Sequence, residues 1–372
     1  LEIFNKKRRN SEVGNDLKFF NVNKMQTYNN LYGKLCSYEN LLLAYKKARK
    51  GKTKKDYVIK FEKNLENNLK LLQFELINKT YQPKKLKLFI IRDPKTRKIC
   101  KSIFRDRIVH HAIINLLEPI YEKIFIYDSY ASRLNKGQHK ALNRFDYFKR
   151  KVSINGKKLK GIKDNNYICG YCLKADIKKY FDNVDHKILI NIIRKKIKDE
   201  NVIWLINRVM SNKMGGDGKK GMPLGNYTSQ FFANVYLNEL DYFIKHKLKI
   251  RYYIRYVDDI VILHNNKNIL EFYEEKINNF LKNNLKLELH ENKSKIISLH
   301  KGIKFLGFRN FYYYRLLKKS NIIKIRRSLR EWKRDYQQNK INEGKLKSKA
   351  DSWKEHASHA NSYNLINKLN LK

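Results

Sequence analysis

Long apolar runs are absent from this chain of 372 residues. No stretch approaches the roughly 20 consecutive apolar residues that a helix needs to cross a bilayer. The first residues also lack the layout of a secretion signal, in which a charged start is followed by an apolar stretch. We therefore expect a soluble, cytoplasmic protein.

Cysteine is scarce as well, and the four that occur do not have the spacing of a complete zinc site. Cys169 and Cys172 have half of such a spacing, but no second Cys or His pair follows at a usual interval. We predict reduced structural thiols. His356 and His359 could share one helical face as metal ligands, although packing or phosphate binding is the commoner role of such a pair.

Acidic residues are few relative to basic ones, with 35 Asp and Glu against 82 Lys and Arg and a formal net charge of +47. This balance favours binding to a polyanion, and nucleic acid fits best. The cations are spread along almost every segment, so a groove for a duplex is more plausible than a localisation signal. The excess of positive charge could instead come from a biased genome composition and from solvated surface charge. We expect both nucleic-acid binding and these effects to contribute.

Two adjacent carboxylates, Asp258 and Asp259, lie between two strand-like runs. Residues 251–255 are rich in aromatic and β-branched side chains, and residues 260–263 are continuously apolar. The aspartates therefore lie at a predicted hairpin tip, where like charges repel unless a cation such as Mg²⁺ binds between them. A polar turn is the alternative, because Asp is common in turns.

A second predicted strand, residues 171–177, carries Asp176 near its end. Two strands that bring carboxylates to one sheet edge could hold two metal ions, the arrangement that serves phosphoryl transfer in polymerases. Asp182 and Asp185 are weaker candidates, since an aspartate just past a strand more often caps the next helix.

An ordered set of motifs runs along the chain: Arg105–His111, Asp176 with Phe181, Gly221–Gly225, Tyr256–Asp259, Lys293 and Phe305–Phe308. With this set the chain resembles the reverse transcriptase family over roughly residues 31–361. The segment Pro223–Gln230 contains a Ser229-Gln230 pair, and within that family it resembles the enzymes of diversity-generating retroelements, with this pair as the sharpest signal of that subfamily.

The resemblance implies the roles of the acidic residues and their neighbours. Asp176 and Asp258 would bind two Mg²⁺ ions, with Asp259 as an auxiliary ligand and the Ile177 carbonyl completing one shell. Lys293 matches the lysine that donates a proton to the leaving group. The reaction is attack of a primer 3′-hydroxyl on a deoxynucleotide with release of pyrophosphate.

The nucleotide site is implied in the same way. Lys95 and Arg97 lie on a predicted hairpin, residues 86–103, and match residues that hold the triphosphate; ordinary turn chemistry is the alternative. Phe181 matches the steric gate against a ribose 2′-hydroxyl, and a core phenylalanine is the alternative. Leu224, beside Gly225, replaces a glutamine that touches the new nucleotide in the family at large, so we expect poorer discrimination.

The expected partners are template RNA, its duplex with complementary DNA, deoxynucleotides, and a small basic ring-forming accessory variability protein. Relatives of the retroelement type miscopy adenines and thereby diversify a target gene. The alternatives are a retron, abortive-infection or intron reverse transcriptase, a non-catalytic RNA-binding relative, and an RNA-dependent RNA polymerase. The Ser229-Gln230 pair and the lack of a C-terminal extension disfavour the intron type, while Phe181 disfavours the RNA polymerase.

We predict an α+β fold with the right-hand polymerase architecture of fingers, a palm with an antiparallel sheet, and a helical thumb. The predicted divisions are a mobile extension over 1–30, fingers over 31–165, a palm over 166–308 and a basic helical thumb over 309–372. Helices are expected from Ser37 to Gly51, across Val58–Leu72, and from Arg105, with a kink or break at Pro119.

Overall fold

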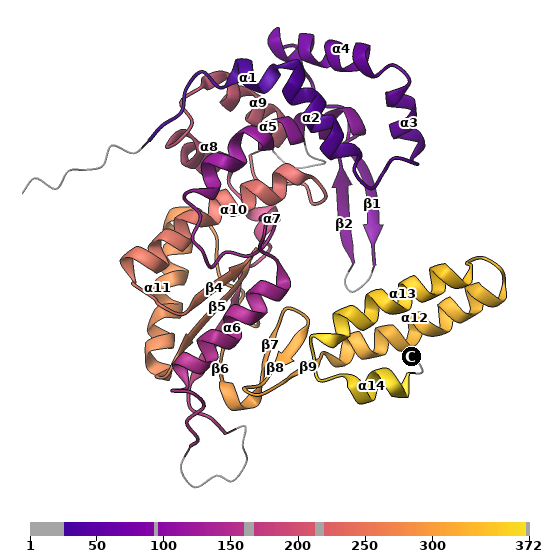
Figure 1. Ribbon diagram of the computed structural model, residues 1–372. Helices are drawn as coiled ribbons and strands as arrows, with labels where there is room; N and C mark the ends of the chain where they lie inside the picture. Colours follow the sequence, from indigo (N-terminus) through magenta and orange to yellow (C-terminus); the bar gives the residue numbers. More distant parts are fainter. Residues whose placement is uncertain (1–25, 93–95, 160–166, 213–218, 370–372) are drawn as a thin grey trace, which may run out of the picture.

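The computed structural model describes residues 26–92, 96–159, 167–212 and 219–369, and it combines helices with three antiparallel sheets (Figure 1). The larger helices are α1 Tyr32–Cys36, α2 Tyr38–Arg49, α3 Asp56–Glu62, α4 Leu65–Ile77, α5 Phe104–Glu122, α6 Gln138–Val152, α8 His186–Arg194, α9 Glu200–Ser211, α10 Tyr227–Tyr242, α11 Lys267–Leu285, α12 Lys319–Gln337, α13 Glu343–Ser358 and α14 Tyr363–Lys368. The strands are β1 Lys87–Ile91, β2 Arg97–Lys101, β3 Tyr171–Asp176, β4 Tyr253–Tyr256, β5 Asp259–His264, β6 Lys295–Ser298, β7 Ile303–Phe305, β8 Phe308–Asn310 and β9 Arg315–Leu317. Short turns of helix complete the list, at α7 Tyr180–Asn183, η1 Phe243–Lys247 and η2 Leu299–Lys301.

The first helices show how local sequence sets their ends. Ser37 caps α2 as predicted, because its hydroxyl accepts the backbone N–H of Asn40. The helix expected across Val58–Leu72 is two helices, α3 and α4. Pro119 does not break α5, which runs on to Glu122, since Ile120 and Tyr121 beyond it are buried in the core.

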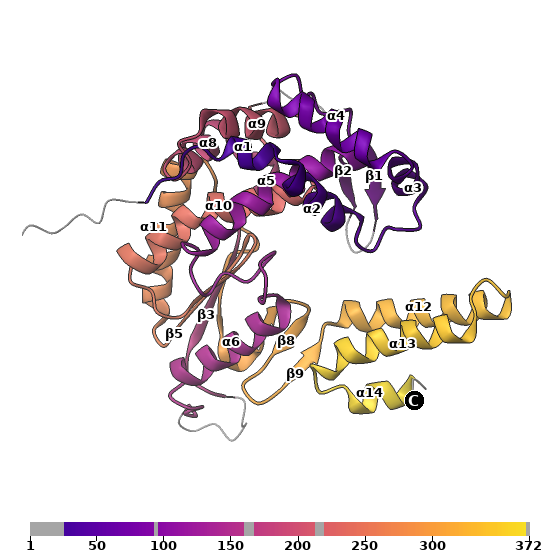
Figure 2. The same ribbon diagram turned by 45° about the horizontal axis from the view of Figure 1, so that its top comes forward.

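The central sheet has the strand order β4-β5-β3-β6, and all its pairs are antiparallel. The apolar run of β5 is buried on both faces: Ile260 and Ile262 join the larger core cluster, while Val261 and Leu263 join the smaller one. Helix α11 packs on β3 and β5, helix α6 packs on β4 and β5, and Figures 1 and 2 show these two helices on opposite sides of the sheet. Helices on both faces therefore hold the sheet rigidly, and the ends of β3 and β5 with it.

Two further parts extend from this centre. The hairpin β1–β2 projects from the helices α1–α5, and every residue of β1 is exposed. The small sheet β7-β8-β9 leads into α12, α13 and α14, which form a separate helical arm (Figures 1 and 2). In α12 the buried residue is Ile325, so most of this basic helix faces outward.

The structure can be compared with three of the divisions predicted from sequence. Residues 1–25 of the predicted mobile extension over 1–30 lie outside the described residues, and Tyr28, in the remaining part, forms a parallel bridge with Ile197. Helix α6, placed in the predicted fingers, packs on the central sheet through Phe145 and Phe148. The predicted thumb over 309–372 contains β9 before its first helix.

In the part of the chain that the structure describes, no helix is both long and apolar enough to cross a membrane.

Candidate active site

The two adjacent aspartates lie at the turn between β4 and β5. Tyr256 pairs with Asp259 at the end of the ladder, so Val257 and Asp258 form a two-residue turn. Val257 has a φ of +56°, a left-handed conformation that is uncommon for a β-branched residue. Asp258 is thus at the hairpin tip, as the sequence predicts, whereas Asp259 is the first residue of β5.

Asp176 lies beside this turn. It is the last residue of β3 and is paired directly with Asp259 across the antiparallel ladder. The chain after it is fixed as well: Ile177 forms a bridge with Leu289, and the backbone N–H of His290 donates to the Asp176 carbonyl at 2.7 Å. Three aspartates from two separate segments are therefore brought to one edge of the sheet.

Two lysines lie against these carboxylates. The ammonium of Lys293 donates to Oδ2 of Asp176, and Nζ of Lys174 lies 3.4 Å from Oδ1 of Asp259. Lys293 follows a turn in which its own N–H donates to the His290 carbonyl at 3.0 Å. The predicted proton donor is therefore adjacent to the acidic edge.

The pKa of the Asp258 carboxyl group is raised above its ordinary value. Burial, and then the negative charges of Asp176 and Asp259, raise its pKa to about 6, while Lys293 acts in the opposite direction. A bound cation would offset the repulsion between this carboxylate and the other two. The electrostatics therefore favour a positive ion at this position.

Within the described ranges, no three His, Cys, Asp or Glu side chains form a group that could hold a metal ion. Asp176 and Asp259 face lysines instead. The donors nevertheless fit Mg²⁺, which prefers carboxylate oxygens and often takes only one or two from the protein, with substrate phosphates supplying others. The raised pKa of Asp258 is the observation that supports this fit.

A cavity of about 210 Å³ opens beside the turn formed by Val257 and Asp258. It collects four of the residues predicted to bind nucleotide, together with Val257 of the turn. These four are Arg97, Phe181, Leu224 and Gly225. Phe181 also packs against the larger core cluster, as in the alternative that the sequence analysis gave for it. Lys95 lies outside the described residues.

Strand β2 docks onto the segment that carries Leu224. The backbone N–H of Cys100 donates to the Leu224 carbonyl at 2.8 Å. Gly225 has a φ of +116°, and a Cβ there would lie 2.7 Å from Cγ2 of Ile99. Only glycine permits this backbone and this approach, so Gly225 keeps Arg97 on β2 next to the cavity.

The pair Ser229-Gln230 connects two loops at the same cavity. Ser229 donates to the Pro223 carbonyl at 2.8 Å and so fastens the segment before Leu224 to the first turn of α10. Ser132 donates to Oε1 of Gln230 at 3.2 Å. Sequence reasoning missed Ser132, because 98 positions separate it from Gln230.

The structure also assigns the other acidic candidates. Oδ1 of Asp185 accepts the N–H of Ile188 at 3.2 Å and caps α8, which confirms the capping alternative. Asp182 is exposed on the short helix α7.

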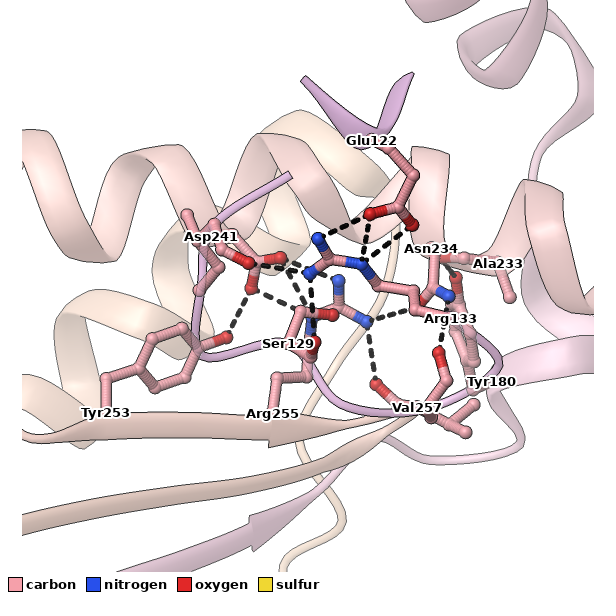
Figure 3. A network of polar contacts seen from close by, with 12 residues as sticks. Glu122, Ser129, Arg133, Tyr180, Ala233, Asn234, Asp241, Tyr253, Arg255 and Val257 are labelled. Carbon is pink, nitrogen blue, oxygen red and sulfur yellow. Dashed lines mark hydrogen bonds and ion pairs between the residues drawn. The ribbon is translucent and has the colours of Figure 1, made fainter. Parts of the chain in front are cut away.

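A buried group that the sequence analysis overlooked is the ion pair of Arg255 with Asp241 (Figure 3). Its signal was a lone arginine between the apolar residues of β4.

Comparison with known proteins places the chain in a family. Residues 83–310 match the model of the reverse transcriptase (RNA-dependent DNA polymerase) family. The chain therefore belongs to the reverse transcriptase family, and its helices and antiparallel sheets confirm the predicted α+β right-hand polymerase fold.

Three curated relatives are similar to this chain. A putative COX1/OXI3 intron 2 protein of Saccharomyces cerevisiae is 26% identical over 84% of this chain and 43% of its own length. The protein YkfC of Escherichia coli is 27% identical over 65% of this chain and 70% of its own length. The group II intron-encoded protein LtrA of Lactococcus lactis is 26% identical over 65% of this chain and 49% of its own length. The chain thus spans about half the length of the two intron proteins.

Proposed function

We propose that this chain is an RNA-directed DNA polymerase that extends a primer with deoxynucleotides on an RNA template. The observation that carries the proposal is the direct pairing of Asp176 with Asp259, beside the turn that presents Asp258. This edge adjoins the cavity that contains Phe181 and Arg97. A primer end at the carboxylates and a nucleotide in the cavity would be neighbours.

The residues divide the chemistry among them. Asp176 and Asp258 would hold two divalent cations, with Mg²⁺ as the expected ion and with Asp259 and the Ile177 carbonyl as further ligands; when bound, these ions would favour ionisation of the attacking hydroxyl and neutralise phosphate charge. The primer 3′-hydroxyl gives up its proton to solvent, its oxygen forms a bond to the α-phosphorus, and the bond between that phosphorus and pyrophosphate breaks.

Five side chains act on the nucleotide itself. Lys293 donates a proton to the departing pyrophosphate, and the cation of Arg97 attracts the triphosphate. Phe181 leaves no room for a ribose 2′-hydroxyl and so selects deoxynucleotides. Leu224 contributes shape without a hydrogen bond. Lys95 is expected to assist Arg97.

The positive charge of the chain supports binding of the RNA template and its duplex. The fingers, over residues 31–165, and the palm, over 166–308, would surround the active end. The exposed basic face of α12 would lie on the duplex backbone as part of a thumb over 309–372. Affinity for an RNA/DNA duplex should therefore fall steeply with salt.

We further propose that the enzyme serves a diversity-generating retroelement. Leu224 and the Ser229-Gln230 pair support this, because they match that subfamily and line one cavity. Adenines in the template would then be miscopied, and the small basic ring-forming accessory protein would be a partner. Sequencing of complementary DNA made on a defined RNA tests this: an adenine error rate no higher than at other bases would reject it, and Leu224→Gln should lower that rate.

An intron-type reverse transcriptase is the second candidate. It is favoured by the similarity to LtrA and to the yeast intron protein. Two results together would support it: errors spread equally over the four template bases, and selective binding of a group II intron RNA over a repeat-derived template RNA of equal length. An excess of errors at adenine, with repeats beside the gene that differ at adenines, would support the retroelement instead.

A further inference from the structure

Arg255 is buried beneath the catalytic turn, which consists of Val257 and Asp258. Its exposed fraction is 0%, and so is that of Asp241, its partner from α10. Nε of Arg255 lies 2.8 Å from Oδ1 of Asp241, and Nη2 lies 2.6 Å from Oδ2. Tyr253 donates to the same Asp241 carboxylate at 2.6 Å, which fixes its orientation (Figure 3). The guanidinium is therefore held in one geometry.

The remaining nitrogen of the guanidinium reaches the turn itself. Nη1 of Arg255 donates to the Val257 carbonyl at 3.2 Å and to Oδ1 of Asn234 at 3.0 Å. Val257 has the strained left-handed backbone noted above. A β-branched residue stays in that conformation only when its surroundings impose it. The hydrogen bond from Arg255 is such a constraint, and it acts one residue before Asp258.

The same network holds the loop that lines the nucleotide cavity. Nδ2 of Asn234 donates to the Ala131 carbonyl at 2.9 Å. The backbone of Arg255 accepts from Tyr130 N–H at 3.0 Å and donates to the Asp128 carbonyl at 3.0 Å. Ser132, next in this loop, contacts Gln230 at the cavity wall. One buried arginine thus touches both the catalytic turn and the support of the substrate pocket.

Arg133 strengthens the far side of this loop. Its guanidinium forms a bidentate pair with Glu122, in which Nη2 donates to Oε2 at 2.8 Å and Nε donates to Oε1 at 2.9 Å, and it also donates to the carbonyls of Ile126 and Ser129. The loop is therefore anchored to α5 at one end and to Arg255 at the other (Figure 3). A movement of the Arg255 side chain would therefore shift both the turn at Val257 and this loop.

We propose that Arg255 is a positioning residue for DNA synthesis. Through Val257 it directs the Asp258 carboxylate toward Asp176, and through Asn234 it keeps the Ser132 loop in place at the cavity. This inference rests on the proposed polymerase function. The rival role is a buried ion pair that contributes stability alone, and such pairs can often be replaced by apolar residues without loss of folding.

The experiment replaces the whole pair. In the double variant Arg255→Met with Asp241→Leu, no buried charge is left unpaired, so folding should survive. We expect kcat for primer extension to fall at least about 100-fold, while KM for the deoxynucleotide changes less than about 3-fold. Hydrogen exchange at the amides of residues 256–259 and 128–132 should become faster, with the rest of the central sheet unchanged.

Two further variants keep the test decisive. Val257→Gly leaves the ion pair intact and releases the strained backbone, so it should reduce kcat even if the double variant does not fold. Lys149→Met removes another buried cation, which is paired with Asp146 at 2.6 Å on α6, away from this network. It should lose stability and keep wild-type kcat.

The outcomes separate the inference from the function on which it rests. A wild-type chain without primer extension would reject the polymerase proposal. A wild-type chain that extends primers, beside a folded double variant or a Val257→Gly variant with unchanged kcat and unchanged exchange, would overturn the positioning role of Arg255. A stability loss alone would assign the pair to folding.

Discussion

Asp176 and Asp259 are direct partners across the ladder of β3 and β5, although 83 positions separate them along the chain. Antiparallel pairing places directly opposed residues within about 4.5–5.5 Å between their Cα atoms. Two carboxylates at that spacing, with Asp258 on the adjacent turn, form a concentration of negative charge. The first two predictions below follow from how the chain compensates that charge.

The first prediction concerns pH and Asp258. Its pKa is raised to about 6 in the folded chain, against about 3.9 when unfolded. The stability that its protonated form contributes is therefore present below about pH 4 and lost as pH rises through about 6. In the absence of Mg²⁺, Asp258→Asn should thus raise the free energy of unfolding near pH 8 by about 1–3 kcal/mol, and have little effect near pH 4.

Chemical denaturation at the two pH values measures this difference. Addition of Mg²⁺ near pH 8 should stabilise the wild-type chain more than the Asp258→Asn variant, because the ion binds the ionised carboxylate. An equal effect of the substitution at both pH values would contradict the repulsion that we infer at this edge.

The second prediction concerns Lys293, which is paired with Asp176. Lys293→Ala should lower kcat about 100-fold through loss of a proton donor. The Mg²⁺ concentration needed for half-maximal rate should fall, because the ammonium no longer competes for Asp176. Steady-state extension at several Mg²⁺ concentrations measures both. Lys178→Ala is the matched control, since Lys178 forms an exposed pair with Glu288 at 2.7 Å and should change neither value.

The third prediction concerns Phe181 at the cavity wall. Phe181→Ala should reduce the preference for deoxynucleotides over ribonucleotides by about 10- to 200-fold, because the ring no longer excludes the 2′-hydroxyl. The measurement is the ratio of kcat/KM for the two nucleotides, which a general loss of stability does not alter. Tyr180→Phe removes only a hydroxyl that donates to the Ala233 carbonyl, and its ratio should stay at the wild-type value.

The fourth prediction concerns Gly225, where a Cβ would meet Ile99. Gly225→Ala should destabilise the chain by about 1–3 kcal/mol, displace β2 and raise KM for the deoxynucleotide. Thermal unfolding and extension kinetics check the two effects. Gly33→Ala is the control, because a Cβ there meets no atom within 4 Å and a helical alanine should stabilise slightly. Equal behaviour of the two variants would contradict the close approach.

Sequence patterns predicted the acidic edge because each strand has a short local signature. Ser37 and Asp185 were predictable as helix caps for the same reason, since a cap involves residues only three positions apart. The fate of Pro119 was not predictable locally, because burial of the residues after it outweighs the lost hydrogen bond. Local signals therefore located elements, and tertiary packing decided their extent.

The supporting contacts of the site could not be predicted in this way. Ser132 meets Gln230 across 98 positions, and Arg255 meets Asp241 only because α10 crosses β4. No periodicity encodes such pairs. The sequence thus predicted which aspartates meet at the sheet edge, but not the contacts that support them.

The central claim is that the carboxylates around Asp258 catalyse DNA synthesis on RNA. The most direct measurement is extension of a DNA primer on a defined RNA template with Mg²⁺, for the wild-type chain, Asp258→Asn and the exposed control Asp182→Asn. We expect wild-type and control chains to extend the primer equally, and Asp258→Asn to lose at least about 1,000-fold in rate. Equal extension by Asp258→Asn, with all three chains folded, would contradict the account.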